Sequence, residues 1–270
     1  MEPAPAWVTV IAVGDRPQQK FKMIRENRRM DKSESKHADM AGLPLPVAPD
    51  QGSLPPSHLY FRSPQGVEDQ SGDFGWRRLP VGLGVAAAPM AVPSQVTIPL
   101  WRNVPEQIST KRAYLQLPRL DPGCQYLCFL LCDPQIREKE GGSWLRTPQL
   151  RMQKLNHPRM MIKSLLIRNF ASRPIAYRLG DAESEILKAG SRRSFEMFDF
   201  DAYHPFVFAD AVSDKVYVRS VLRPHRDRLT VLILYDRARS SQQDGAPGLF
   251  RVSVRRLSGP QLRLKAGGTS

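Results

Sequence analysis

The 270-residue chain has little cysteine and no long apolar segment. Its three cysteines are too few for a fully paired disulfide framework. No uninterrupted apolar run approaches the roughly 18 residues of a membrane-spanning helix, so we expect no membrane span. A long amphipathic helix is also missing, since 22–37 lacks a continuous apolar stripe. These absences argue against a disulfide scaffold, a membrane-embedded protein and a helical bundle.

Catalytic and nucleotide-binding motifs are missing as well. No glycine-rich phosphate loop follows a strand, because the glycines of 81–89 have the wrong spacing and no helix follows them. There is no G-x-S-x-G nucleophile elbow, and the five histidines are dispersed without the order of a catalytic triad. The sequence therefore indicates no enzyme class, and we expect no cofactor.

The N-terminal apolar stretch from Trp7 to Val13 lacks the features of a signal peptide. No basic segment precedes it, and Asp15, Arg16 and Pro17 follow where small residues would mark a cleavage site. The stretch predicts a β-strand, with no export signal in the sequence as given. A misassigned start codon would leave the envelope or periplasm open, so we assign no compartment.

Short β-branched and aromatic runs separated by turn signals recur along the chain and are typical of an all-β protein. The 24 prolines favour short strands and structured loops, because proline neither continues a helix nor donates to a β-ladder. We predict two β-sandwich units, immunoglobulin-like or cupredoxin-like, with long proline-rich connecting segments. The expected boundaries are 1–135 for the first unit, 136–157 for a linker, 158–258 for the second unit and 259–270 for a flexible tail.

A gapless comparison of 112–133 with 215–236 indicates a faint internal repeat. Tyr114 aligns with Tyr217, and the same shift of 103 positions holds along both segments. In each, a strand leads through a proline-containing turn into a long apolar strand that ends with aspartate. The match is consistent with duplication of one unit, and chance similarity between two strand pairs is the alternative.

The three cysteines lie within one short apolar stretch and have the spacing C-x₃-C-x₃-C. In a β-strand, Cys124, Cys128 and Cys132 share one face, with Tyr126 and Leu130 between them. At about 3.3 Å per residue, neighbouring thiols are about 13 Å apart, too far to share one metal ion. Because the flanking prolines favour a strand over a helix, we expect structural thiols and no metal there.

Asp199, Asp201 and His204 form the most chemically suggestive cluster, in the stretch FDFDAYHPF. In an extended run the two carboxylates share a face, and such a group could bind a hard cation or serve acid–base chemistry. The spacing of a calcium loop is absent. We interpret the stretch as an ordinary turn, with a metal or catalytic site as the alternative.

Positive charge is the strongest global signal. Lysine and arginine number 40 against 26 acidic residues, a formal net charge of +14, which favours polyanions as partners. Two segments, 219–228 and 250–256, concentrate arginine, which suits bidentate contacts to phosphate or carboxylate. If their strands share a sheet, six arginines would form one basic surface; a dispersed, merely solubilising charge is the alternative. The basic surface would consist of Arg219, Arg223, Arg226, Arg228, Arg251 and Arg255.

We therefore expect a non-catalytic binding or scaffold protein whose basic surface holds an acidic polymer or an acidic protein partner. The strand-and-turn cadence of 164–198 is similar to that of small β modules in bacterial envelope proteins, which would place the protein at the cell envelope if the start codon is misassigned. One alternative is an enzyme that acts on a carbohydrate or acidic polymer, with its site at 199–204. Another is a nucleic-acid-binding protein, for which only Tyr217 lies near the arginines as a stacking aromatic.

Overall fold

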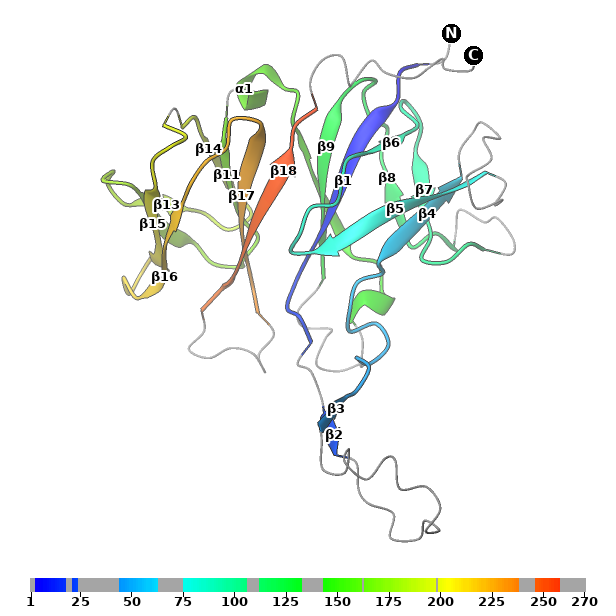
Figure 1. Cartoon of the computed structure of the whole chain (residues 1–270), viewed down its shortest axis with the longest axis horizontal. Helices are drawn as coiled ribbons and strands as arrows, with labels where there is room; N and C mark the ends of the chain where they lie inside the picture. The colour runs from blue at the N-terminus through cyan, green and yellow to red at the C-terminus, as the bar shows by residue number, and fades with distance from the viewer. Residues whose placement is uncertain are drawn as a thin grey trace, which may run out of the picture.

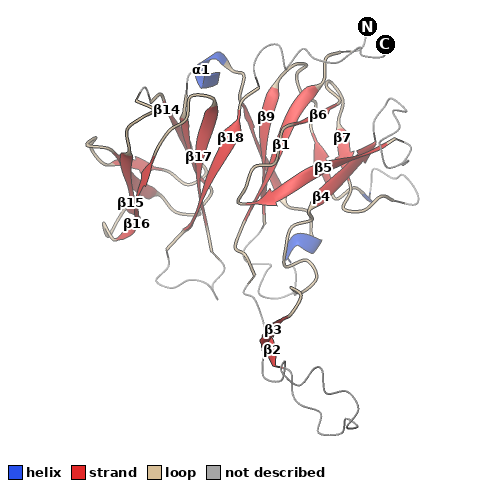
Figure 2. Cartoon of the chain, in the orientation of Figure 1, coloured by secondary structure: helices blue, strands red, loops and turns tan. Residues whose placement is uncertain are grey.

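The computed structural model shows a chain built almost entirely of β-strands in several sheets (Figures 1 and 2). Strands account for 50% of the described residues and helices for 3%, which confirms the all-β class predicted from the sequence. The division into two sandwich units stays a prediction. The structure describes residues 3–17, 21–23, 44–62, 75–105, 112–132, 143–161, 163–197, 199–237 and 246–257.

The first half of the chain forms a mixed sheet around the strand β1. This strand (Ala6–Val13) runs parallel to β9 (Gln125–Leu131) on one side and to β5 (Trp76–Leu83) on the other. The strand order is β10-β9-β1-β5-β4, and β6 also pairs with β1. The remaining bounds are β4 (His58–Arg62), β6 (Met90–Val92) and β10 (Gln149–Lys154).

Shorter elements flank this sheet. The pair β7 (Ile98–Leu100) and β8 (Leu115–Leu117) lies beside β4, because Tyr60 and Trp101 exchange backbone hydrogen bonds of 2.7 and 2.9 Å. A separate pair projects from the rest of the molecule in Figure 1. Its strands are β2 (Phe21–Met23) and β3 (Pro44–Pro46), and the short helices are η3 (Ser143–Leu145) and α1 (Pro158–Met161).

The second half contains two four-stranded sheets. In the order β14-β11-β17-β18, the strand β11 runs parallel to β17, and the outer pairings are antiparallel. In the order β13-β12-β15-β16, all pairings are antiparallel. The bounds are β11 (Leu165–Asn169), β12 (Ile175–Leu179), β13 (Glu185–Leu187), β14 (Arg192–Phe195), β15 (His204–Asp210), β16 (Val216–Leu222), β17 (Arg228–Tyr235) and β18 (Gly248–Arg255).

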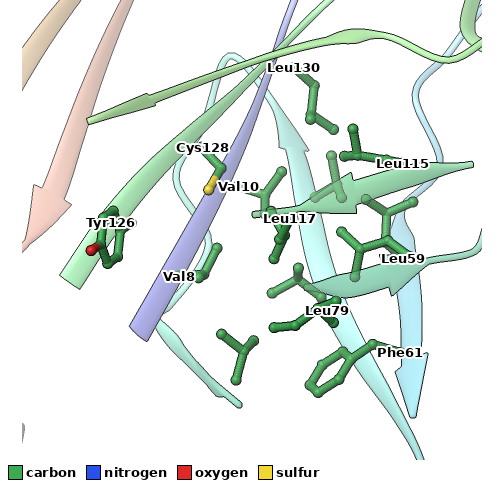
Figure 3. Close-up of a cluster of buried hydrophobic side chains, with 14 of the residues drawn as sticks. Val8, Val10, Leu59, Phe61, Leu79, Leu115, Leu117, Tyr126, Cys128 and Leu130 are labelled. Carbon is green, nitrogen blue, oxygen red and sulfur yellow. The ribbon is translucent and has the colours of Figure 1, made fainter. Parts of the chain in front are cut away.

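Three apolar clusters hold these layers together. The first lies within the first half, where Figure 3 shows Val8 and Val10 of β1 pointing towards Leu79 and Leu117. The second lies between the two sheets of the second half, with Ile167 of β11 among its members. A third, which we name the central cluster, joins the halves. Its buried members include Ile11, Val13, Leu127 and Phe129 from the first half and Leu229, Val231, Ile233, Val252 and Val254 from the second.

The central cluster explains why the longest apolar strands carry no polar face. Alternate side chains of β1 enter the first cluster and the central cluster, so both faces of the strand are covered. The strands β9 and β17 are buried on both faces for the same reason. A strand covered on both sides has a near-continuous apolar sequence, which is unlike the alternation of a half-exposed strand.

The cysteine-containing strand has the predicted orientation. Cys128, Tyr126 and Leu130 lie together in the first cluster, and the half-buried Cys124 and Cys132 pack against the same cluster. None of the three cysteines is in a disulfide. Burial raises the pKa of the Cys128 thiol to about 12. These contacts are those of cysteines that pack as small apolar side chains.

The structure adds a strand within the predicted linker. β10 lies inside 136–157 and forms the edge of the first sheet, where it pairs with β9. The unit boundaries themselves stay a prediction, and the predicted tail, 259–270, lies outside the described residues. None of the described helices is long and apolar enough to cross a membrane.

Candidate anion-binding sites

The six arginines of the predicted basic surface are all exposed, but two sheets carry them. Arg219 is on β16, whereas the four-stranded sheet opposite holds Arg228 on β17 and Arg251 and Arg255 on β18. The remaining two are in the turn between β16 and β17. The strands β16 and β18 of the two basic segments therefore lie in different sheets, and β18 shares its sheet with β17.

The strand β18 has the two faces that its sequence predicts. Val252 and Val254 are buried in the central cluster, and the alternate residues Arg251 and Arg255 are exposed. Arg251 Nη1 donates a hydrogen bond of 3.0 Å to the backbone oxygen of Val221, which ties β18 to the neighbouring sheet. Arg255 lies directly opposite Arg228 in the antiparallel ladder, so two guanidinium groups start from facing positions.

The turn between β16 and β17 places arginines beside aromatic rings. The Arg223 guanidinium lies 5.9 Å from the ring centre of Tyr203, which is 66% exposed. The Arg226 guanidinium lies 5.7 Å from the ring centre of Phe200. Both distances fit cation–π contacts. We name this region, together with the adjacent arginine pair, the turn patch: Phe200, Tyr203, Arg223, Arg226, Arg228 and Arg255.

Tyr203 was missed as a stacking residue because about twenty positions separate it in sequence from the arginine that it faces. In the sequence, Tyr217 is the aromatic residue nearest to the arginines of 219–228. Tyr217 is half-buried and donates a hydrogen bond of 2.5 Å to Asp210, so its hydroxyl already serves the β15–β16 connection. The fold brings 199–204 next to the β16–β17 turn. Only this contact shows that the exposed Tyr203 ring lies beside an arginine.

Asp199, Asp201 and His204 lie close together but serve their own loop. The Asp199 carboxylate accepts hydrogen bonds from the backbone nitrogens of Asp201 and Ala202, at 3.1 and 3.0 Å. His204 Nε2 lies 2.9 Å from the Asp199 backbone oxygen, and Asp201 forms a 3.2 Å ion pair with Arg223. The bonds to the Asp199 carboxylate are those of an Asx turn, and the Asp201 ion pair joins this loop to the β16–β17 turn. Within the described part of the chain, no group of three or more histidine, cysteine or acidic residues could hold a metal ion.

A second basic site, which no sequence pattern predicts, lies between the edge strands β10 and β14. Here the two halves border an open cavity of about 690 Å³. Arg192 Nη1 on β14 donates a hydrogen bond to Gln153 Oε1 on β10, which links the two edges. We name this cavity the basic cleft; its lining residues are Gln153, Lys154, His157, Met160, Lys163, Arg192 and Ser194.

Acidic neighbours neutralise two of the cations that line the basic cleft. Lys154 Nζ lies 2.7 Å from Asp121 Oδ2, which raises the pKa of the lysine to about 12. Lys163 Nζ lies 3.5 Å from Glu196 Oε2. In the part of the chain that the structure describes, no such acid pairs with Arg192. The lining that the structure describes therefore keeps a positive charge.

Arg168 adds a buried cation next to the basic cleft. It is 8% exposed and lies directly opposite Arg192 in the β11–β14 ladder. Its guanidinium is 4.8 Å from the ring centre of Phe170, and its Nε has no hydrogen-bond partner among the described residues. Burial, together with the positive charges of Arg192 and Arg151, lowers the pKa of Arg168 to about 10.

The chain matches no known protein family, and no curated protein matches it. The geometry of the two basic sites and the global charge therefore carry the functional argument.

Proposed function

We propose that this protein is a non-catalytic binding protein that holds an acidic polymer on the turn patch. The observation that carries the proposal is the exposed arrangement of Arg226, Arg228 and Arg255, for which no ion pair occurs in the described part of the chain. Guanidinium groups that share a face favour a ligand with repeated negative charges over one with a single charge. An acidic protein partner would use the same contacts.

The arginine pair of the ladder supports this proposal further. Like charges directly opposite each other in an antiparallel pair destabilise the sheet, because their repulsion has no compensating contact. Arg228 and Arg255 occupy such positions. An anionic group bound between them would remove the repulsion, so the ligand and the fold would stabilise each other.

Single-stranded nucleic acid is the second candidate, and Tyr203 is the observation that favours it. An exposed ring beside an arginine can stack on a base while the guanidinium contacts a phosphate. The enzyme alternative has no comparable support, since Asp199 and His204 are hydrogen-bonded within their loop and Asp201 is paired with Arg223. The cell-envelope location stays a prediction from the sequence.

The test is a triple substitution, Arg226→Glu, Arg228→Glu and Arg255→Glu, in the full-length chain. These three side chains are exposed. Arg223 and Arg251 are left unchanged because each donates a hydrogen bond to a backbone oxygen. We expect the variant to leave immobilised heparin at a clearly lower salt concentration than the wild-type protein. On single-stranded poly-dT, the slope of log K against log salt should flatten by about 2, because about 0.7 counterion is released per phosphate contact.

A matched control separates the turn patch from the global charge. The variant with Arg77→Glu, Arg119→Glu and Lys188→Glu loses the same charge from exposed positions elsewhere. It should bind both polymers nearly as the wild type does. Equal weakening in the two variants would mean that only net charge attracts polyanions. The single change Tyr203→Ala distinguishes the candidates, since it should weaken poly-dT binding and leave heparin binding unchanged.

A further inference from the structure

Around the basic cleft lie three arginines that no acid among the described residues neutralises. Arg168 and Arg192 face each other across the β11–β14 ladder. Arg151 lies on β10 opposite Phe129, whose ring packs 5.2 Å from that of Phe170, the aromatic partner of Arg168. Three guanidinium groups from both halves thus surround one end of the central cluster.

This arrangement costs stability in the free protein. A buried cation without a charged partner loses hydration that a cation–π contact restores only in part. Among the described residues, no acid pairs with Arg151, Arg168 or Arg192, and the nearest ion pairs involve Lys154 and Lys163 instead. A bound anion would supply the missing countercharge.

We propose that the basic cleft binds a ligand that carries a phosphate monoester. Such a group has nearly two negative charges at neutral pH and three acceptor oxygens, which suits several guanidinium and ammonium donors. Arg192 reaches it from β14, the side chains of Lys163 and Ser194 line the same wall, and the charge of Arg168 stabilises it from behind.

The size of the cleft indicates that the ligand is larger than free phosphate. A cavity of about 690 Å³ lies within the range of sites for small organic molecules. Met160, one of its walls, offers an apolar contact for the body of such a ligand. This site shares no residue with the turn patch, so the inference does not depend on the proposed function.

The experiment measures binding of inorganic phosphate and of phenyl phosphate by calorimetry at constant ionic strength. We expect both to bind, and phenyl phosphate at least tenfold more tightly, because its ring occupies the rest of the cleft. Arg192→Gln should weaken both at least tenfold. The control Arg178→Gln, on an exposed position of β12 in another sheet, should bind both as the wild type does.

Arg168→Met gives an independent readout through the melting temperature. Without phosphate this variant should melt no lower than the wild type, because an unpaired buried cation is removed. With phosphate the wild type should gain stability by mass action and the variant should gain clearly less. If Arg168→Met does not fold, the calorimetry of Arg192→Gln still tests whether the basic cleft binds phosphate.

Two results would overturn the proposal. One is an equal affinity for phosphate in the wild type and in Arg192→Gln. The other is a wild type that binds neither probe at millimolar concentration. Equal affinities for inorganic and phenyl phosphate would overturn the assignment of an organic ligand and leave a free-phosphate site. The triple variant of the turn patch should retain the phosphate response, so failure of one proposal is distinguishable from failure of the other.

Discussion

Arginines in facing positions occur at both ends of one sheet. In the order β14-β11-β17-β18, the pair Arg168 and Arg192 spans the first two strands, and Arg228 and Arg255 span the last two. Each pair opposes folding by repulsion unless an anion lies nearby. A surface selected for solubility alone would gain more from dispersed charges. The two pairs therefore support separate anion contacts on opposite edges of the sheet.

The thiols provide a prediction at the residue scale. Only a thiolate attacks Ellman's reagent, and Cys128 is fully buried with its pKa raised to about 12, whereas Cys124 and Cys132 are half-buried. At pH 8 we expect the native protein to react at two thiols, and at the third only after unfolding in guanidinium. In Cys128→Ala the native reaction should be unchanged and the slow thiol absent. Equal reaction of all three thiols in the native wild type would contradict the burial of β9.

A residue's position could be predicted where neighbouring residues in the sequence determine it, and not where the pairing of distant strands determines it. The shared face of Cys124, Cys128 and Cys132 follows from the two-residue period of a strand, which the sequence displays directly. The position of Arg168 opposite Arg192 depends on which strands pair, and no local pattern encodes that pairing. For the same reason, the sequence indicated basic segments on β16 and β18 but not the basic cleft between distant edges.

At the scale of elements, the two halves repeat one arrangement of strands. In each half the first strand runs parallel to the penultimate one, β1 with β9 and β11 with β17. The penultimate strand then pairs antiparallel with the last strand. A shift of 103 positions places the start of β9 on the start of β17, as in the repeat between 112–133 and 215–236. This correspondence supports duplication over chance similarity, although Asp133 itself lies outside the described residues.

The end of β18 is fastened to β9 by one buried side chain, which gives a prediction about elements. Gln125 Nε2 donates to the backbone oxygen of Arg255 at 2.9 Å, and Gln125 Oε1 accepts from the backbone nitrogen of Leu257 at 3.0 Å. Gln125→Met keeps the volume and removes both bonds, so the free energy of unfolding should fall by about 1–3 kcal/mol. Chemical denaturation measures this change.

The control for this prediction is Gln116→Met, which alters an exposed side chain of β8 and should change the stability by less than about 0.5 kcal/mol. Hydrogen exchange at the Leu257 amide should also accelerate in Gln125→Met. Unchanged stability and exchange would mean that the bridge between β9 and β18 contributes nothing.

At the scale of the whole molecule, the central cluster is the feature that the sequence patterns predicted least. A residue such as Val231 is apolar whether it faces the layer within its own half or the layer of the other half. The apolar runs of β1, β9 and β17 therefore predict buried strands without indicating what covers each face. The predicted division into two units with a linker at 136–157 left out the surface that the two halves share. Contacts between strands far apart in sequence form this surface, and no local sequence pattern reveals them.

This joint surface predicts that the halves unfold together, and the tryptophans make the prediction measurable. The four tryptophans, at 7, 76, 101 and 144, all belong to the first half, so their fluorescence reports that half alone. Leu232 is buried in the cluster between the two sheets of the second half. Leu232→Ala should lower the free energy of unfolding by about 2–5 kcal/mol, the usual cost of such a cavity. Because the central cluster couples the halves, the tryptophan transition should shift to lower denaturant by the same amount as the circular dichroism transition.

Ile186→Ala, at a 61% exposed position of β13, is the control and should shift neither. A Leu232→Ala protein whose tryptophan transition stays at its wild-type midpoint, while the dichroism splits into two steps, would show that the halves are independent and that the central cluster does not couple them.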